Sequence, residues 1–206
     1  MDRYKTEQEK FWAGEFGSNY IGRNSDAKLM ESNLNIFSKI LKSTNNINSV
    51  IEFGANIGMN LLALKKLLPN AEFTGIEINK EAAKELSKIE RVDSINTTIF
   101  DFNTIDKWDF SFTKGVLIHI EPDYLSNVYL KLYESSKKWI CIAEYYNPVP
   151  VKIDYRGHSD CLFKRDFAGD MLNQFKDLEL VDYGFAYHRD PLFPQDDITW
   201  FLMKKN

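Results

Sequence analysis

The sequence has little of what metal-binding, disulfide-stabilised or membrane-spanning proteins require. Its 206 residues contain two cysteines, Cys141 and Cys161, which form no C-x-x-C motif. The three histidines are scattered, so we expect no metal site. No apolar run approaches the roughly 20 residues that span a bilayer, and we expect no membrane partner. Two thiols without a pairing pattern favour inert, buried cysteines in a reducing compartment.

The first ten residues and the charge balance exclude further classes. The start, MDRYKTEQEK, is charged and has no apolar stretch, so it predicts no secretory signal, and we expect a cytoplasmic protein. Lysines and arginines number 26 against 30 acidic residues, a formal net charge of -4. Because nucleic-acid-binding proteins usually carry excess or clustered positive charge, we expect no nucleic-acid partner.

Short buried runs alternate with helical stripes along most of the chain. The runs predict strands at 50–53, 73–78, 95–100, 110–116 and 139–145, and the stripes predict helices at 27–42, 57–68, 80–89, 124–136 and 165–175. This alternation indicates a parallel sheet with helices on both faces. We interpret residues 1–27, and the segment after Pro148 and Pro150, as irregular.

The carboxyl-terminal end departs from this alternation. Two further strands are predicted at 178–187 and 198–204, and the loop HRDPLFPQDD between them has no helical pattern. Strands joined without a crossover helix pair antiparallel. The sequence therefore predicts an α/β fold, a doubly wound, mostly parallel seven-stranded sheet with a carboxyl-terminal antiparallel hairpin. We expect one structural domain, in which an aromatic lid segment and helix (1–45) precede the main part (46–206).

A glycine turn joins the first predicted strand to its helix. In EFGANIG, Gly54 permits a sharp bend and Gly58 permits close packing at the helix start. We expect N–H groups of the first helical turn to face a ligand. A dinucleotide fingerprint reads G-x-G-x-x-G, whereas Asn56 replaces its second glycine here. The pattern thus favours S-adenosylmethionine (SAM) over NAD.

Acidic residues follow the next two predicted strands. Glu77 ends the second strand, where a carboxylate can accept both ribose hydroxyls of an adenosine. Asp101 follows the third strand and can accept from the adenine amino group, and Phe102 can flank the ring. The predicted cofactor-binding residues are Gly54, Ala55, Asn56, Gly58, Met59, Asn60, Glu77, Ile78, Asp101 and Phe102.

These segments resemble the class I SAM-dependent methyltransferases, through EFGANIG, GIEIN, the Asp101–Phe102 pair and GVLIHI. The chain is also similar to a narrower group, the methyltransferases associated with biosynthesis of pseudaminic acid and related nine-carbon sugar acids. That similarity rests on FWAGEFGSNYIGRN, AEYYNPVPV, YRGHSDCLFKRDFAGDML and HRDPLFPQDDITWF. The resemblance implies a Rossmann-like methyltransferase fold with SAM as cofactor. It also implies methyl transfer, in a glycan-modification pathway, to a nonulosonic acid sugar or its nucleotide-activated form.

Methyl transfer requires an acceptor atom held in line with the sulfonium and, for an oxygen acceptor, removal of a proton. The candidate catalytic residues are His119, Glu144 and Lys114, near the ends of the fourth and fifth strands. His119 suits a general base because its ordinary pKa is about 6.5. A hydrogen-bonded packing histidine is the competing interpretation.

Predicted substrate contacts follow the fifth strand. Cationic side chains there can pair with a carboxylate or phosphate, and ordinary surface charge is the alternative. The predicted substrate-binding residues are Tyr145, Tyr146, Asn147, Arg156, His158, Lys164 and Arg165. We expect a small acidic sugar as partner and a monomer or homodimer. The competing functions are an NAD-dependent sugar oxidoreductase and a non-catalytic SAM-fold binding module.

Overall fold

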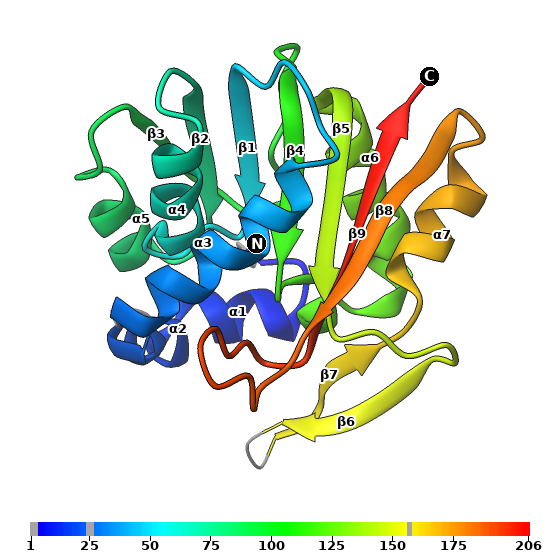
Figure 1. Ribbon diagram of the computed structural model, residues 1–206. Helices are drawn as coiled ribbons and strands as arrows, with labels where there is room; N and C mark the ends of the chain where they lie inside the picture. Colours follow the sequence, from blue (N-terminus) through cyan, green and yellow to red (C-terminus); the bar gives the residue numbers. More distant parts are fainter. Residues whose placement is uncertain (1–3, 24–26, 156–157) are drawn as a thin grey trace.

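The structure is a computed structural model that describes residues 4–23, 27–155 and 158–206. Seven strands of these residues form one sheet in the order β3-β2-β1-β4-β5-β9-β8 (Figure 1). They are β1 (Ser49–Phe53), β2 (Glu72–Glu77), β3 (Val92–Asn96), β4 (Trp108–Lys114), β5 (Ser136–Glu144), β8 (Leu178–Ala186) and β9 (Ile198–Lys205). Strands β1 to β5 pair parallel, and β9 pairs antiparallel with β5 and β8. The predicted mostly parallel sheet with an antiparallel hairpin is confirmed.

Helices pack on both faces of the sheet and bury two apolar clusters. The first cluster includes residues of α3 (Ala27–Leu41), α4 (Met59–Leu67) and α5 (Lys80–Leu86). The second includes residues of α6 (Leu125–Glu134) and α7 (Phe167–Gln174). Side chains alternate between faces along a strand. For this reason the consecutive residues 50 and 51 of β1 belong to different clusters.

The amino-terminal segment is helical, which corrects the expectation of an irregular chain. It contains α1 (Glu7–Ala13), α2 (Glu15–Tyr20) and a 3-10 helix at Ile21–Arg23. Thr6 caps α1 by accepting from the Glu9 N–H at 3.1 Å. Helices of seven and six residues are too short to show a clear apolar period. Both lie at the edge of the sheet where the parallel strands end, with α2 on the side of α5 (Figure 1).

A hairpin after Pro150 is the second correction. Strands β6 (Val151–Tyr155) and β7 (His158–Lys164) form a separate antiparallel pair, where we expected an irregular loop. The prolines precede β6 and so remove no N–H from its ladder. The opposed pair Ile153 and Leu162 brings a half-exposed residue against a buried one.

The third strand begins and ends earlier than its apolar residues predict. We expected residues 95–100, whereas β3 covers Val92–Asn96. Phe100 and Phe102 are both buried although they lie in the loop after β3, so their apolar character reflects packing of a loop. Among the described residues, no helix combines the length and apolarity needed to cross a membrane.

Candidate cofactor and acceptor site

A cavity of about 240 Å³ lies at the edge of the sheet where the parallel strands end. Gly54 and Glu77 line it from the ends of β1 and β2, and Lys114 lines it from the end of β4. Trp12 of α1 and Gln195 of the β8–β9 loop complete its walls. The cavity therefore joins the amino-terminal helices, the strand ends and the closing hairpin.

The glycine turn has the backbone that the sequence predicts. Gly54 has φ of 79°, and a Cβ atom there would lie 2.5 Å from Cγ2 of Val116. Gly58 has φ of 85°, and its Cβ would lie 2.6 Å from the Leu86 side chain. Gly54 lines the cavity, whereas Gly58 is buried against α5 outside the cavity lining. Gly58 thus serves packing, which the sequence also indicated.

The backbone N–H groups within this turn already have partners. The N–H groups of Gly54 and Ala55 both donate to the Ile76 carbonyl at 2.9 Å. The Ile57 N–H donates to Oδ1 of Asn56 at 2.8 Å, and the Gly58 N–H donates to the Ala55 carbonyl at 2.9 Å. A turn that cradles a pyrophosphate presents free N–H groups to it. The chain from 54 to 58 therefore does not suit a dinucleotide phosphate.

The carboxylate of Glu77 connects the turn to the next strand. Its Oε2 accepts from the Asn56 N–H at 2.7 Å, and its Oε1 accepts from the Asn79 N–H at 2.7 Å. Burial raises the pKa of Glu77, and the backbone N–H groups of Asn79, Asn56 and Ile78 oppose this increase. Each oxygen keeps a second lone pair, so the carboxylate can accept further hydrogen bonds at the cavity wall.

Asn79 attaches the amino-terminal helices to this region. Its Oδ1 caps α5 by accepting from the Glu81 and Ala82 N–H groups at 3.0 and 3.1 Å. Its Nδ2 donates to the Trp12 carbonyl at 3.2 Å and to Oγ of Ser18 at 3.3 Å. One side chain thus holds both α5 and the α1–α2 segment that covers the cavity.

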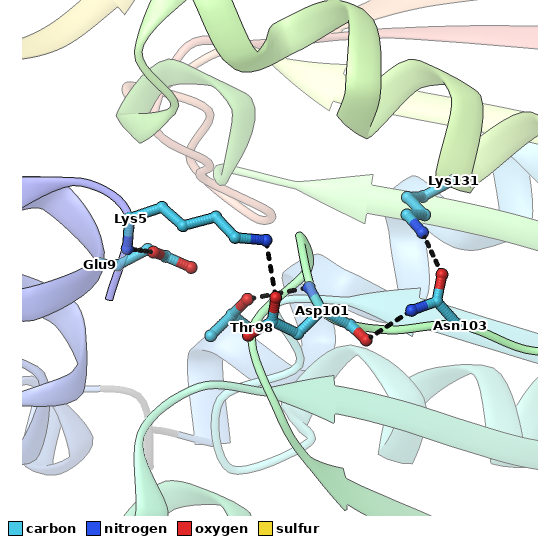
Figure 2. A network of polar contacts seen from close by, with 6 residues as sticks. All are labelled: Lys5, Glu9, Thr98, Asp101, Asn103 and Lys131. Carbon is cyan, nitrogen blue, oxygen red and sulfur yellow. Dashed lines mark hydrogen bonds and ion pairs between the residues drawn. The ribbon is translucent and has the colours of Figure 1, made fainter. Parts of the chain in front are cut away.

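A second attachment of the amino-terminal segment is visible in Figure 2. Nζ of Lys5 pairs with Asp101 at 2.6 Å, and the Lys5 N–H donates to Glu9 at 2.6 Å. The Asp101 N–H donates to the Thr98 hydroxyl at 3.1 Å, and Asn103 links the Asp101 carbonyl to α6. Asp101 is exposed and adjoins the cavity lining at Phe100.

Most predicted cofactor positions meet at one cavity. The positions that line it are Gly54, Ala55, Asn56, Met59, Asn60, Glu77 and Ile78. Phe102 does not line the cavity, so its expected place beside an adenine ring is wrong. It is a core residue whose ring lies 5.7 Å from that of Phe53. Phe100, two positions earlier, lines the cavity instead, because β3 ends early and the loop turns.

Glu144 lies beneath the loop that follows β4. Its Oε1 accepts from the N–H groups of Val116 and Leu117 at 2.9 and 3.0 Å. Burial raises the pKa of Glu144 to about 7, and the backbone N–H groups of Leu117 and Val116 oppose this increase. It does not line the cavity. The structure therefore gives Glu144 a positioning contact under Gly115–His119 in place of the expected catalytic contact.

Lys114 and His119 both line the cavity. Burial lowers the pKa of Lys114, and the negative charges of Glu52, Asp196 and Glu144 oppose this decrease. His119 is buried, and its ring lies 4.7 Å from that of Trp12 in α1. Both the base and the packing interpretation of His119 agree with this placement.

The predicted substrate residues are spread over different places. Tyr145 lines the cavity, and Nζ of Lys164 lies 4.9 Å from its ring centre. Arg165 pairs with Asp170 at 2.7 Å. Tyr146 is exposed, and its ring lies 5.7 Å from that of Phe201. The side-chain amide of Asn147 donates to the Val149 carbonyl. Of His158 the structure describes only the backbone, in β7, and Arg156 lies outside the described residues.

Sequence reasoning missed several residues at the cavity. Glu52, in β1, is fully buried and does not line the cavity itself, but its Oε1 accepts from the cavity-lining Asn60 at 2.6 Å. Burial raises the pKa of Glu52 to about 8. The one sequence signal for a buried carboxylate here was a single acidic residue inside the apolar run VIEF. Asn33 and Gln195 also line the cavity and bond to each other, a contact that no local pattern reveals.

Comparison with known proteins shows similarity at the level of the fold. No family model matches the sequence, and no curated protein matches it. Magnesium protoporphyrin IX methyltransferase (ChlM) from Synechocystis PCC 6803, solved with S-adenosylhomocysteine (SAH), has a TM-score of 0.73 and 11% identity. The alignment covers 98% of this chain and 100% of that chain.

Two further solved structures agree. The 1,6-didemethyltoxoflavin-N1-methyltransferase of Burkholderia thailandensis, with SAH, has a TM-score of 0.71, 14% identity and coverage of 100% and 93%. The plantazolicin methyltransferase BpumL, with SAH, has a TM-score of 0.64, 14% identity and coverage of 97% and 94%. The chain thus has the Rossmann-like fold of SAM-dependent methyltransferases.

Proposed function

We propose that this protein is a SAM-dependent methyltransferase that acts on a small polar acceptor. The observation that carries the proposal is the hydrogen bond between Glu77 and Asn56, which joins a predicted ribose acceptor to a glycine turn at the wall of an open cavity. The three similar structures described above contain bound SAH, the product that SAM becomes after methyl transfer. When bound, SAM supplies a methyl group on a sulfonium; every other contribution comes from this chain.

The cofactor half of the cavity suits an adenosyl group. Glu77 offers lone pairs to the ribose hydroxyls, and Ile78 and Phe100 offer apolar surface to the adenine. Asp101, beside Phe100, is proposed to accept from the adenine amino group and shares its carboxylate with Lys5. The absence of free N–H groups from 54 to 58 favours SAM over NAD, since SAM has no phosphate.

The finer proposal concerns the acceptor, a carboxylate-bearing nonulosonic sugar or its nucleotide-activated form. Lys114 is the only lysine or arginine among the described residues that line the cavity, and it can pair with a carboxylate. Lys164 does not line the cavity, but its Nζ lies 4.9 Å from the ring centre of Tyr145, which does. For an oxygen acceptor, His119 is proposed to take the proton at one of its ring nitrogens.

We further propose that residues 1–45 act as a lid and helix on the domain 46–206. Trp12 and Tyr20 line the cavity from α1 and α2. Asn79 holds these helices over the strand ends. A closed lid excludes water from the sulfonium and the acceptor.

Mass spectrometry tests the proposal directly. The purified protein is incubated with SAM and a panel of free and nucleotide-activated acidic sugars, and both SAH and a methylated product are measured. We expect both products with wild type. We expect Lys114→Met to raise the acceptor KM by about tenfold to a hundredfold, through loss of a charge-assisted bond. Lys66→Met, on the exposed side of α4, is the matched control.

Two results would contradict the proposal. Calorimetry that shows NAD binding without SAM binding would favour the oxidoreductase alternative. If the protein binds SAM but forms neither SAH nor a methylated sugar, the result would favour the alternative of a non-catalytic binding module.

A further inference from the structure

The cavity has two halves that the strand order separates. Gly54 follows β1 and Glu77 ends β2, whereas Gln195 and Asp196 lie in the loop shortly before β9. In the sheet, β4 and β5 lie between β1 and β9. Neighbouring strands are about 4.8 Å apart, so the strands β1 and β9 themselves are about 14 Å apart in the sheet. We call the part of the cavity wall next to β9 the distal half, because it follows other strands than the predicted adenosyl positions.

Two side-chain amides meet in this distal half. Nε2 of Gln195, in the β8–β9 loop, donates to Oδ1 of Asn33, in α3, at 3.0 Å. Asn33 is 1% exposed and Gln195 is 6% exposed, and both line the cavity. The bond leaves Oε1 of Gln195 as an acceptor and Nδ2 of Asn33 as a donor, and Nε2 of Gln195 keeps its second N–H. Among the described residues, neither Oε1 of Gln195 nor Nδ2 of Asn33 has a hydrogen-bond partner.

Both amides line the cavity, so a ligand or water inside it can complete their hydrogen bonds. Here the two free ends, one donor and one acceptor, belong to adjacent side chains on one cavity wall. A neutral group that donates and accepts at once, such as a hydroxyl or a carboxamide, satisfies both. An anion would lack the proton that Oε1 of Gln195 requires, and an ammonium would lack the lone pair that Nδ2 of Asn33 requires.

The surrounding structure holds the two amides in place. The Gln195 N–H donates to the Tyr187 carbonyl at 3.2 Å, and the Asp197 N–H donates to the Gln195 carbonyl at 2.9 Å. Asp197 also accepts from the His188 N–H at 3.0 Å. Asn33 lies on α3, whose residues Ile36 and Phe37 are part of the first core cluster. A preorganised pair of this kind gives selectivity because little ordering is needed when a ligand binds.

We propose that Asn33 and Gln195 form an acceptor-recognition subsite for a neutral hydroxyl or carboxamide group of the substrate. The inference rests on the proposed function and specifies its substrate. The acceptor carries such a group in addition to the atom that receives the methyl group. With Lys114 on the same cavity, the subsite selects a polyhydroxylated or acylamino acid over a simple carboxylic acid.

The test measures binding of a defined probe to the protein–SAH complex. The probe is N-acetylneuraminic acid, which carries a carboxylate, hydroxyls and an acetamido group, observed by saturation-transfer difference NMR. The variants are Gln195→Leu and Asn33→Leu, each of which removes the amide and keeps a similar volume. Gln174→Leu is the matched control, because Gln174 is exposed on α7 and bonds to Ser126. Calorimetry with SAH is run on every variant.

We expect the wild-type complex to bind the probe, and each amide variant to weaken probe binding about tenfold while the SAH Kd stays within about twofold. The control should match wild type in both measurements. Unchanged probe binding in both amide variants would overturn the subsite, as would a wild-type SAH complex that does not bind the probe. Variants that lose SAH and probe binding together would assign the amides a structural role. A wild-type protein that fails to bind SAH would instead contradict the proposed function itself.

Discussion

Oε2 of Glu77 lies 2.7 Å from the backbone nitrogen of Asn56, so the carboxylate at the end of β2 accepts a hydrogen bond from the turn after β1. The two residues are 21 positions apart in the chain. They meet because β1 and β2 pair in parallel with Phe53 opposite Ile76. The sheet register thus fixes the distance between the turn and the carboxylate. Both line the cavity, which residues of α1 and α2 also line.

The conformation of Gly54 gives a first prediction. Gly54→Ala places a Cβ atom 2.5 Å from Cγ2 of Val116 on a residue with φ of 79°. We expect a loss of about 1 to 3 kcal/mol in the free energy of unfolding, measured by urea denaturation, and weaker SAH binding. Gly22→Ala is the control, since a Cβ there meets no atom within 4 Å. Equal stability of the two variants would contradict the close approach at Val116.

Glu52 predicts a dependence of stability on pH. Burial raises its pKa from 4.5 to about 8, so between these values the folded protein binds more protons at this site than the unfolded chain. The stabilisation from the protonated group is present below about pH 4.5 and is lost as the pH rises through about 8. Wild type should therefore lose stability relative to Glu52→Gln by up to about 1.4 kcal/mol per pH unit in this window.

Urea denaturation of both proteins from about pH 5 to about pH 8 measures the difference. Glu72→Gln, on exposed Glu72 of β2, serves as the control, and its stability should follow that of wild type. Parallel curves for wild type and Glu52→Gln would show that Glu52 carries no such linkage.

The double role of Asn79 gives a prediction for the proposed lid. Asn79→Ala removes the cap of α5 and also the contacts to Trp12 and Ser18. Asp166→Ala removes a comparable cap, the one on α7 that accepts from the Gly169 N–H at 2.8 Å. Each variant should lose about 1 kcal/mol. Only Asn79→Ala should speed hydrogen exchange across residues 7–20, because of these two capping residues only Asn79 bonds to α1 and α2.

Hydrogen exchange followed by mass spectrometry reads the effect peptide by peptide. If exchange across residues 7–20 rises equally in the two cap variants, the increase reflects general destabilisation. Asn79 would then have no particular part in holding the lid.

Much of the fold was predictable because its strands are buried. Strands β1, β2, β4 and β5 are short apolar runs, and α3 shows a clear apolar period over 15 residues. The helices α1 and α2 were not predictable, since seven and six residues interrupted by Gly14 show too few turns for a period. The hairpin of β6 and β7 was missed because two prolines precede it, although Val151, Ile153 and Tyr155 alternate along β6.

The candidate site was predictable only where it depends on local patterns. Gly54 and Glu77 mark strand ends, and strand ends meet at one edge of a parallel sheet. The contact between Asn33 and Gln195 joins residues 162 positions apart, and no spacing rule reaches that far. Phe100 and Phe102 were equally apolar, and only the point where β3 ends decides which of them lines the cavity.

The central claim is that Glu77 binds the ribose of SAM beside the glycine turn. Isothermal titration calorimetry with SAH on Glu77→Gln tests it, with Glu72→Gln from the opposite end of β2 as control. We predict that the Kd for SAH rises about tenfold to a hundredfold in Glu77→Gln, the loss of one to two charged hydrogen bonds, and stays at the wild-type value in the control. A folded Glu77→Gln protein with wild-type affinity for SAH would contradict the account.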